Sequence, residues 1–152
     1  MTTGTRTRDT ITAAAVSGVC AGTTIMTLNG EVSVERLAPG ARVITRDTGM
    51  AVLRAVSVRT VRTAPIRIKA GSLGHTRPDR DMIVPPGAQI HIRDWRAQAL
   101  FGAPAATVAA SRLVDGEFLA VQALQDMQVY TLTFDAQHII YADGIEMASA
   151  AV

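Results

Sequence analysis

The pattern of apolar and polar positions predicts a chain built mainly of short β-strands. Apolar and polar residues alternate in Ile66–Lys69 and again in Gln89–Arg93, the period of two that puts neighbouring side chains on opposite faces of a sheet. Between residues 22 and 45, β-branched segments are separated by Asn29-Gly30 and by Pro39-Gly40, which are dipeptides typical of turns. We therefore expect a mainly all-β domain.

Three further strand predictions specify pairing or burial. Residues 51–62 are rich in Val and Thr and are expected to form one long exposed strand that pairs with Val43-Ile44. The continuous apolar run at 82–84 predicts a buried strand. The segments 129–134 and 138–141 are separated by three residues, which predicts that they pair as a hairpin.

The segment that begins at Asp94 carries the end signals of a short helix. Asp94 is a favourable N-cap, and Gly102 is a favourable C-cap. A helix from Asp94 to Leu100 has only about two turns, which is too short to persist without tertiary packing. We therefore expect Trp95 to be substantially buried against the sheet.

Several short motifs follow one another along the chain. They are Gly22-Thr23-Thr24-Ile25, the V-x-x-L-x-x-G-x-x-V-x-T pattern that ends at Thr45, Pro65–Ile68, Gly71–Gly74, Asp81–Pro86, Ala110–Val114 and Ala142-Asp143-Gly144. In this order and spacing the chain resembles the Hedgehog/intein (Hint) family of self-processing domains, and within it the bacterial stand-alone branch. The resemblance implies a Hint-type, pseudo-two-fold β fold with one short helix over residues 18–149. The composition of residues 1–17 predicts a flexible leader, and residues 150–152 are expected to form a C-terminal tail.

The resemblance also implies a chemistry and the positions that would perform it. In the family, a Cys or Ser attacks the carbonyl of the preceding residue, and a histidine protonates the departing nitrogen. Counted from the motifs, the corresponding positions of this chain are Gly18, Thr23, Ala88 and Gln137. Glycine, alanine and glutamine can act neither as nucleophile nor as proton carrier. We therefore expect a catalytically degenerate domain that acts as a binding or scaffold module.

An active single-turnover domain is the alternative hypothesis. In it, Cys20 would attack across the Val19-Cys20 bond in an N-to-S acyl shift, with His91 or His138 as the acid. Strand alternation opposes this alternative, because both histidines should face away from the family's pocket. We favour Cys20 as a small, buried structural residue.

Charge suggests a third, more distant hypothesis, a nucleic-acid-binding β domain. All 15 basic residues lie within residues 1–112, and residues 113–152 hold six acidic residues and no basic one. The basic residues that could form a nucleic-acid patch are Arg54, Arg59, Arg62, Arg67 and Lys69. They alternate with apolar residues and lack the aromatic residues on which bases stack, which is typical of a solvated strand face. We expect the two charge blocks to neutralise each other within one sheet.

Length and composition set the remaining expectations. A chain of 152 residues with 48% apolar content suits one domain, and no apolar run reaches the roughly 20 residues of a membrane span. A single cysteine forms no internal disulfide and suits a reducing cytoplasm. His75, His91 and His138 lack metal-ligand spacing, so we expect no metal and no cofactor. The sequence identifies no protein partner and no oligomeric state.

Overall fold

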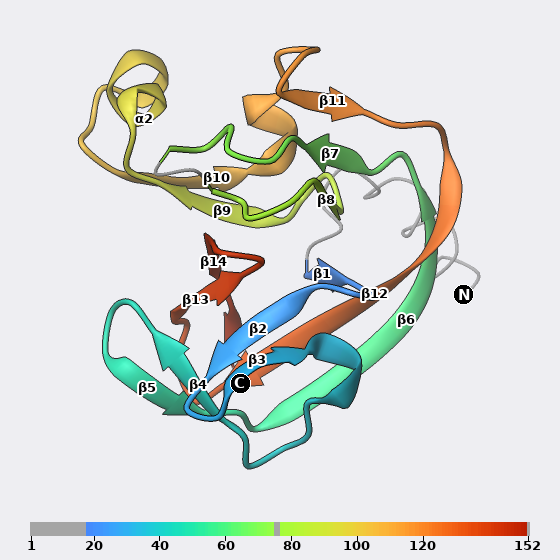
Figure 1. Cartoon of the computed structure of the whole chain (residues 1–152), viewed down its shortest axis with the longest axis vertical. Coiled ribbons are helices and arrows are strands. Elements are labelled where there is room, and N and C mark those ends of the chain that lie inside the picture. The colour runs from blue at the N-terminus through green and yellow to red at the C-terminus, as the bar shows by residue number, and fades with distance from the viewer. Residues whose placement is uncertain (1–17, 75–76, 152) are drawn as a thin grey trace, which may run out of the picture.

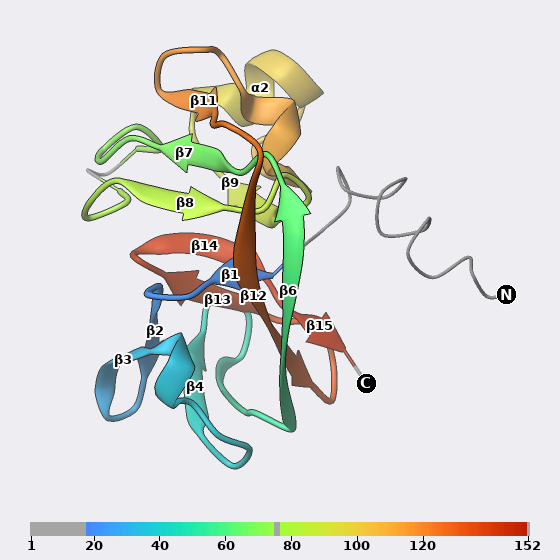
Figure 2. The same cartoon turned by 90° about the vertical axis from the view of Figure 1, so that its right-hand side faces the viewer.

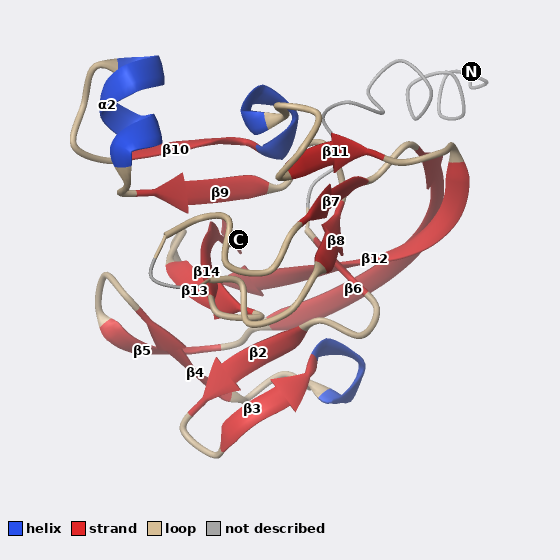
Figure 3. Cartoon of the chain, turned by 45° about the horizontal axis from the view of Figure 1, so that its top comes forward, coloured by secondary structure: helices blue, strands red, loops and turns tan. Residues whose placement is uncertain are grey.

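The computed structural model describes residues 18–74 and 77–151, and its strands form three sheets (Figure 1). The expected leader at residues 1–17 lies outside the described residues. Within the described residues there is one α-helix, α2 (Trp95–Phe101), which Figure 3 shows in blue beside β9 and β10. The predicted mainly β fold with one short helix is confirmed.

The largest sheet has eight strands and supplies much of the core. Its strands, in spatial order, are β10 (Ala106–Ala109), β9 (Gln89–Ile92), β14 (Ile145–Ala148), β13 (Ile139–Ala142), β2 (Thr24–Thr27), β4 (Arg42–Thr45) and β5 (Gly49–Val52), with β3 (Gly30–Ser33) paired to β2. Ile90 and Ile92 of β9 are buried and their neighbours are not, as the alternation predicts.

A long two-stranded ribbon joins the two ends of the molecule (Figure 2). β6 (Ala55–Thr63) pairs with β12 (Gln125–Phe134) along its whole length. Because β6 occupies one edge of β12, the short strands β1 (Val19–Cys20) and β15 (Ala150–Ala151) share the other edge. The first and last described segments therefore meet on one strand.

The third sheet consists of β11 (Leu119–Val121), β7 (Ile66–Ile68) and β8 (Met82–Val84). Ile66 and Ile68 are both buried, which confirms their predicted common face. The prediction of a fully buried strand at 82–84 is wrong at Ile83, which is 39% exposed. β8 lies at the edge of this small sheet, and only Met82 and Val84 point into the core.

The predicted single strand at residues 51–62 is wrong, because the chain divides it at Leu53, but its expected pairing with Val43 is confirmed at Ala51. β5 ends at Val52 and pairs with β4, whereas β6 begins at Ala55 and pairs with β12. The Leu53 side chain is fully buried, and its backbone N–H donates to the carbonyl of Ala41 at 2.8 Å. The buried leucine fixes the point at which the chain leaves one sheet for the other.

The predicted hairpin of residues 129–134 with 138–141 does not form. β13 pairs instead with β14, β2 and β4. The turn between β13 and β14 is Asp143-Gly144, and both residues have positive φ, as a two-residue hairpin turn of the favoured type requires. The local turn chemistry thus selects β14 as the neighbour of β13.

The helix ends are as predicted, but the burial of Trp95 is not. The Asp94 side chain accepts a hydrogen bond from the N–H of Arg96, and Gly102 closes the helix with a left-handed conformation. α2 buries Arg96 and Ala97 and leaves Trp95 67% exposed. The Arg96 guanidinium lies over the indole ring at 4.8 Å and also pairs with Asp94 at 2.6 Å. Arginine therefore takes the inward position that we expected for tryptophan.

Stability measurements on two variants test this packing. Trp95→Ala should lower the free energy of unfolding by about 1 kcal/mol or less, because the ring is already largely in water. Leu53→Ala should cost about 3 kcal/mol, because the leucine is fully buried. Urea denaturation of both variants measures the difference. A loss of about 3 kcal/mol for Trp95→Ala would show that the indole ring is packed in the core after all.

Candidate functional site

A cavity of about 220 Å³ lies where β1 and β15 approach β12, and it brings together residues that are far apart in the sequence. Gly18 and Gln137 both line it, together with Tyr130, Ser149 and Ala150. Gln89, the residue after Ala88, lines it as well. Two of the four expected positions, Gly18 and Gln137, therefore line one cavity, whereas Ala88 does not line it. Thr23 is buried in the turn between β1 and β2, where its N–H donates to the carbonyl of Cys20.

Gly18 leaves no room for a side chain. Its φ is +114°, a conformation that residues with a Cβ rarely adopt. A Cβ built at this position would lie 2.6 Å from the carbonyl oxygen of Tyr130 and 2.9 Å from Cγ1 of Val129. The first of these neighbours is backbone of the central strand β12, which cannot move without disturbing its pairing. Position 18, where the family resemblance would place the nucleophile, is therefore closed to a side chain by the backbone itself.

Ala88 and Gln137 occupy very different environments. Ala88 is fully buried, and its N–H donates to the carbonyl of Pro85 at 3.1 Å while its own carbonyl accepts from Ala110 at 2.8 Å. Its methyl group belongs to the hydrophobic core. Gln137 is exposed at the rim of the cavity.

Cys20 is a buried free thiol on β1, opposite Val129 of β12. Burial raises the pKa of the Cys20 thiol to about 12. The thiolate, which is the nucleophilic form, is therefore a very minor species at neutral pH. Desolvation therefore works directly against the use of this sulfur as a nucleophile.

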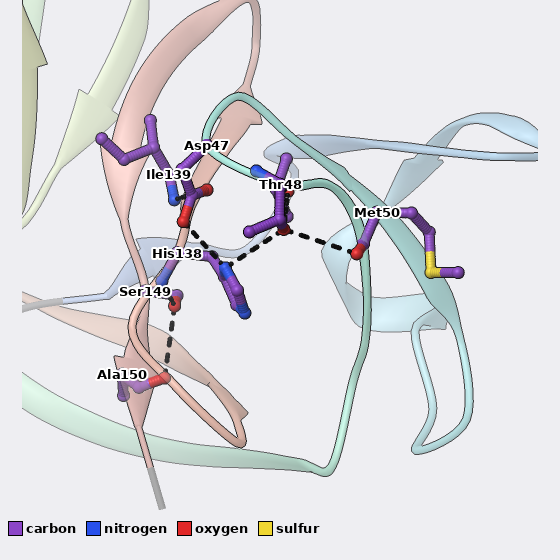
Figure 4. Close-up of polar contacts among 8 residues, drawn as sticks. Asp47, Thr48, Met50, His138, Ile139, Ser149 and Ala150 are labelled. Carbon is purple, nitrogen blue, oxygen red and sulfur yellow. Dashed lines mark hydrogen bonds and ion pairs between the residues drawn. The ribbon is translucent and has the colours of Figure 1, made fainter.

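His138 belongs to a polar cluster beside the β4–β5 turn (Figure 4). Its Nδ1 lies 2.9 Å from a carboxylate oxygen of Asp47 and 3.5 Å from the hydroxyl of Thr48. The other Asp47 oxygen accepts the N–H of Ile139 at 3.0 Å. Desolvation raises the pKa of Asp47, but the hydrogen bonds from Ile139 and His138 together outweigh it and hold that pKa below its usual value. The cluster fastens the turn to the start of β13.

His91 lies in a different cleft. Its Nδ1 is 2.8 Å from the hydroxyl of Thr107, and burial lowers the pKa of the His91 imidazole. In the part of the chain that the structure describes, neither His91 nor His138 hydrogen-bonds Cys20 or lines the cavity at Gly18. The structure does not assemble the alternative constellation of Cys20 with a histidine.

Several basic residues of the early part of the chain pair with acidic residues of the late part, as local neutralisation would require. Arg54 contacts Asp135 at 2.8 Å across the ribbon. Two further pairs of this kind join Arg62 to Asp126 at 3.2 Å and Arg93 to Glu146 at 2.7 Å.

Among the described residues, no group of three or more His, Cys, Asp and Glu side chains could hold a metal ion. In the same residues no helix is long and apolar enough to cross a membrane.

Sequence reasoning missed two buried or nearly buried carboxylates. Asp143 is 4% exposed and accepts hydrogen bonds from the N–H and the hydroxyl of Thr24, at 3.0 and 2.9 Å. Glu146 is paired with both Arg93 and Arg46. In the sequence, Asp143 stands out only as part of a turn motif, and Glu146 is a polar position of an alternating strand. Neither pattern indicates that the carboxylate is buried.

Comparison with known proteins identifies the family. A family model described as a Hint domain matches residues 18–151, so the chain belongs to the Hint domain family. Among solved structures, a bacterial intein-like domain from Clostridium thermocellum is 18% identical, with a TM-score of 0.61 over 89% of this chain and 99% of that one.

Two inteins have similar folds. The MchDnaB-1 intein (N145AA) is 13% identical, with a TM-score of 0.55 over 88% of this chain and 100% of that one. The gp41-1 intein is 10% identical, with a TM-score of 0.53 over 86% and 96% of the two chains. At these identities the likeness concerns the fold alone. No curated protein matches this chain.

The contribution of Asp47 to the free energy of unfolding should depend on pH. A depressed aspartate pKa stabilises the fold above the usual pKa of 3.8, and this stabilisation is lost as the pH falls through the lower pKa of the folded state. Asp47→Ala should therefore cost about 1 kcal/mol at about pH 7, a modest value because the carboxylate is partly exposed, and much less at about pH 2.

Urea unfolding at both pH values measures the effect. Asp126→Ala is the matched control, because its carboxylate is more exposed and pairs with Arg62 on the ribbon. That variant should lose less than about 0.5 kcal/mol at about pH 7. An equal cost of Asp47→Ala at the two pH values would contradict the assignment.

Proposed function

We propose that this Hint domain is catalytically degenerate, does not cleave itself and serves as a binding or scaffold module. The observation that carries the proposal is the closed position at Gly18. A Cβ there meets the carbonyl oxygen of Tyr130 at 2.6 Å, so neither cysteine nor serine fits at the place where the family's nucleophile would stand.

The buried thiol of Cys20 supports the same proposal. An N-to-S shift needs a thiolate and an acid that protonates the departing nitrogen. Burial raises the pKa of Cys20 to about 12, and Ala88 and Gln137 supply no proton. A missing general acid typically costs about 10²- to 10⁴-fold in rate, in addition to the scarcity of the thiolate.

The proposal includes a location and a kind of partner. The single cysteine suits the reducing cytoplasm. Ion pairs between the early basic and late acidic residues reduce the positive charge that nucleic acid could bind, which favours a protein or a small molecule as partner.

Mass spectrometry of the intact chain tests the proposal. The purified chain, incubated with a strong thiol or with hydroxylamine, should keep its full-length mass, because no acyl shift forms a thioester that these reagents could trap. Cys20→Ala should fold and behave in the same way.

A fragment that begins at residue 20 would contradict the proposal if Cys20→Ala abolished it. Cys20→Ser is the matched variant, because a hydroxyl could still take part in a slow acyl shift whereas a methyl group could not. A fragment that persists in Cys20→Ala would instead indicate a contaminating protease.

A further inference from the structure

A second and larger cleft, of about 380 Å³, opens on the eight-stranded sheet. None of the residues that line it also lines the cavity at Gly18. Its volume lies in the range of clefts that bind small molecules. It is therefore separate from the degenerate processing site.

The floor of this cleft is a row of side chains from neighbouring strands. Tyr141 of β13 pairs directly with Glu146 of β14. Continuing the printed registers places His91 opposite Glu146, and Met26 and Ile44 at the next positions beyond Tyr141. All five side chains are half-buried and line the cleft. The row is polar at the end of His91 and Glu146, and apolar at the end of Met26 and Ile44.

The polar end carries an excess of positive charge. Glu146 has 12% of its side chain exposed and accepts two hydrogen bonds from Arg93, from Nε at 3.0 Å and from Nη2 at 2.7 Å. Nε of Arg46 lies 3.3 Å from the same carboxylate. One carboxylate thus faces two guanidinium groups, which leaves one positive charge without a counterpart. Arginine presents further N–H groups in a planar fork that matches a second carboxylate.

Two further polar side chains, His91 and Tyr141, line the same cleft as Arg93. Within the described residues, the hydroxyl of Tyr141 has no hydrogen-bond partner, and neither does Nε2 of His91. When the Thr107 hydroxyl donates to Nδ1 of His91, the ring proton is carried by Nε2 and the nitrogen becomes a donor. Arg93, His91 and Tyr141 line the cleft and can donate into it, whereas Arg46 does not line it and adds its charge through the contact with Glu146.

We propose that this cleft binds a small amphipathic carboxylate, with its anionic head beside Arg93 and its apolar body over Tyr141, Met26 and Ile44. The inference rests on the proposed function only in that both treat the domain as a binding module. Glu31 of β3 pairs with Met26 at the far, apolar end of the row, so it disfavours the reverse orientation of the ligand. Asp94 at the rim is neutralised by Arg96 at 2.6 Å.

An NMR titration with two probes of equal shape and opposite charge tests the proposal. 4-Phenylbutyrate should shift the backbone amides of His91, Tyr141 and Glu146 and saturate in the low millimolar range, as expected for a fragment of its size. 4-Phenylbutylamine should bind at least about tenfold more weakly, because it places a cation beside Arg93.

Variants separate the carboxylate site from non-specific binding. Arg93→Gln should weaken phenylbutyrate about tenfold, and Tyr141→Phe should weaken it about threefold while keeping the aromatic ring. Arg62→Gln is the matched control, because Arg62 is an exposed arginine with one aspartate partner outside the cleft. It should leave the affinity unchanged. If Arg93→Gln does not fold, Tyr141→Phe still tests the site.

Equal binding of the two probes, or shifts confined to other residues, would overturn the proposal, as would the absence of saturation below about 10 mM. The N-acetylated dipeptide acetyl-Leu-Phe, with and without C-terminal amidation, distinguishes a free acid from a peptide C-terminus as the source of the carboxylate. A self-cleaving chain that still bound phenylbutyrate would refute the proposed function alone. An intact chain that failed to bind it would refute this inference alone.

Discussion

The close approach of Gly18, the residue before β1, to β12 is the constraint on which the other features of the site depend. β12 is the central strand of its sheet, with β6 along one edge and with β1 and β15 along the other. Where the chain enters this edge, only a glycine with positive φ avoids the carbonyl oxygen of Tyr130. The same geometry that joins the first and last described strands on β12 therefore removes the space that a nucleophile would need.

Burial and charge pairing explain how the remaining groups are used. The thiol of Cys20 is buried, so it contributes to packing. The same burial raises the pKa of the thiol and lowers its reactivity as a nucleophile. Acidic residues of the last forty positions meet basic residues of the earlier chain in Arg54–Asp135 and Arg93–Glu146. The Hint fold of this chain thus combines a closed backbone position at Gly18 with a second, separate cleft on the eight-stranded sheet.

Local sequence signals predicted local structure well, and long-range packing less well. Alternation identified the buried faces of Ile66–Ile68 and of β9, and the caps at Asp94 and Gly102 fixed the ends of α2. The pairing partners of β6 and β13 were wrong, because they depend on contacts with β12 and β14 that no short sequence window contains. Arg96 displaced Trp95 from the inward position because Asp94 supplies a carboxylate for its guanidinium, a compensation that a hydrophobic pattern does not reveal.

The motif spacing singled out Gly18 and Gln137, which line one cavity, but it could not show that Gly18 has no room for a side chain. Stability measurements on two glycine variants test this lack of room most directly. Gly49 also has positive φ, with nothing within 4 Å of a built Cβ, so Gly49→Ala should cost only the backbone strain of about 1 kcal/mol. Gly18→Ala adds a backbone clash and should cost about 2 kcal/mol more. Equal losses in urea unfolding would show that the site can accept a side chain, and would contradict the central claim.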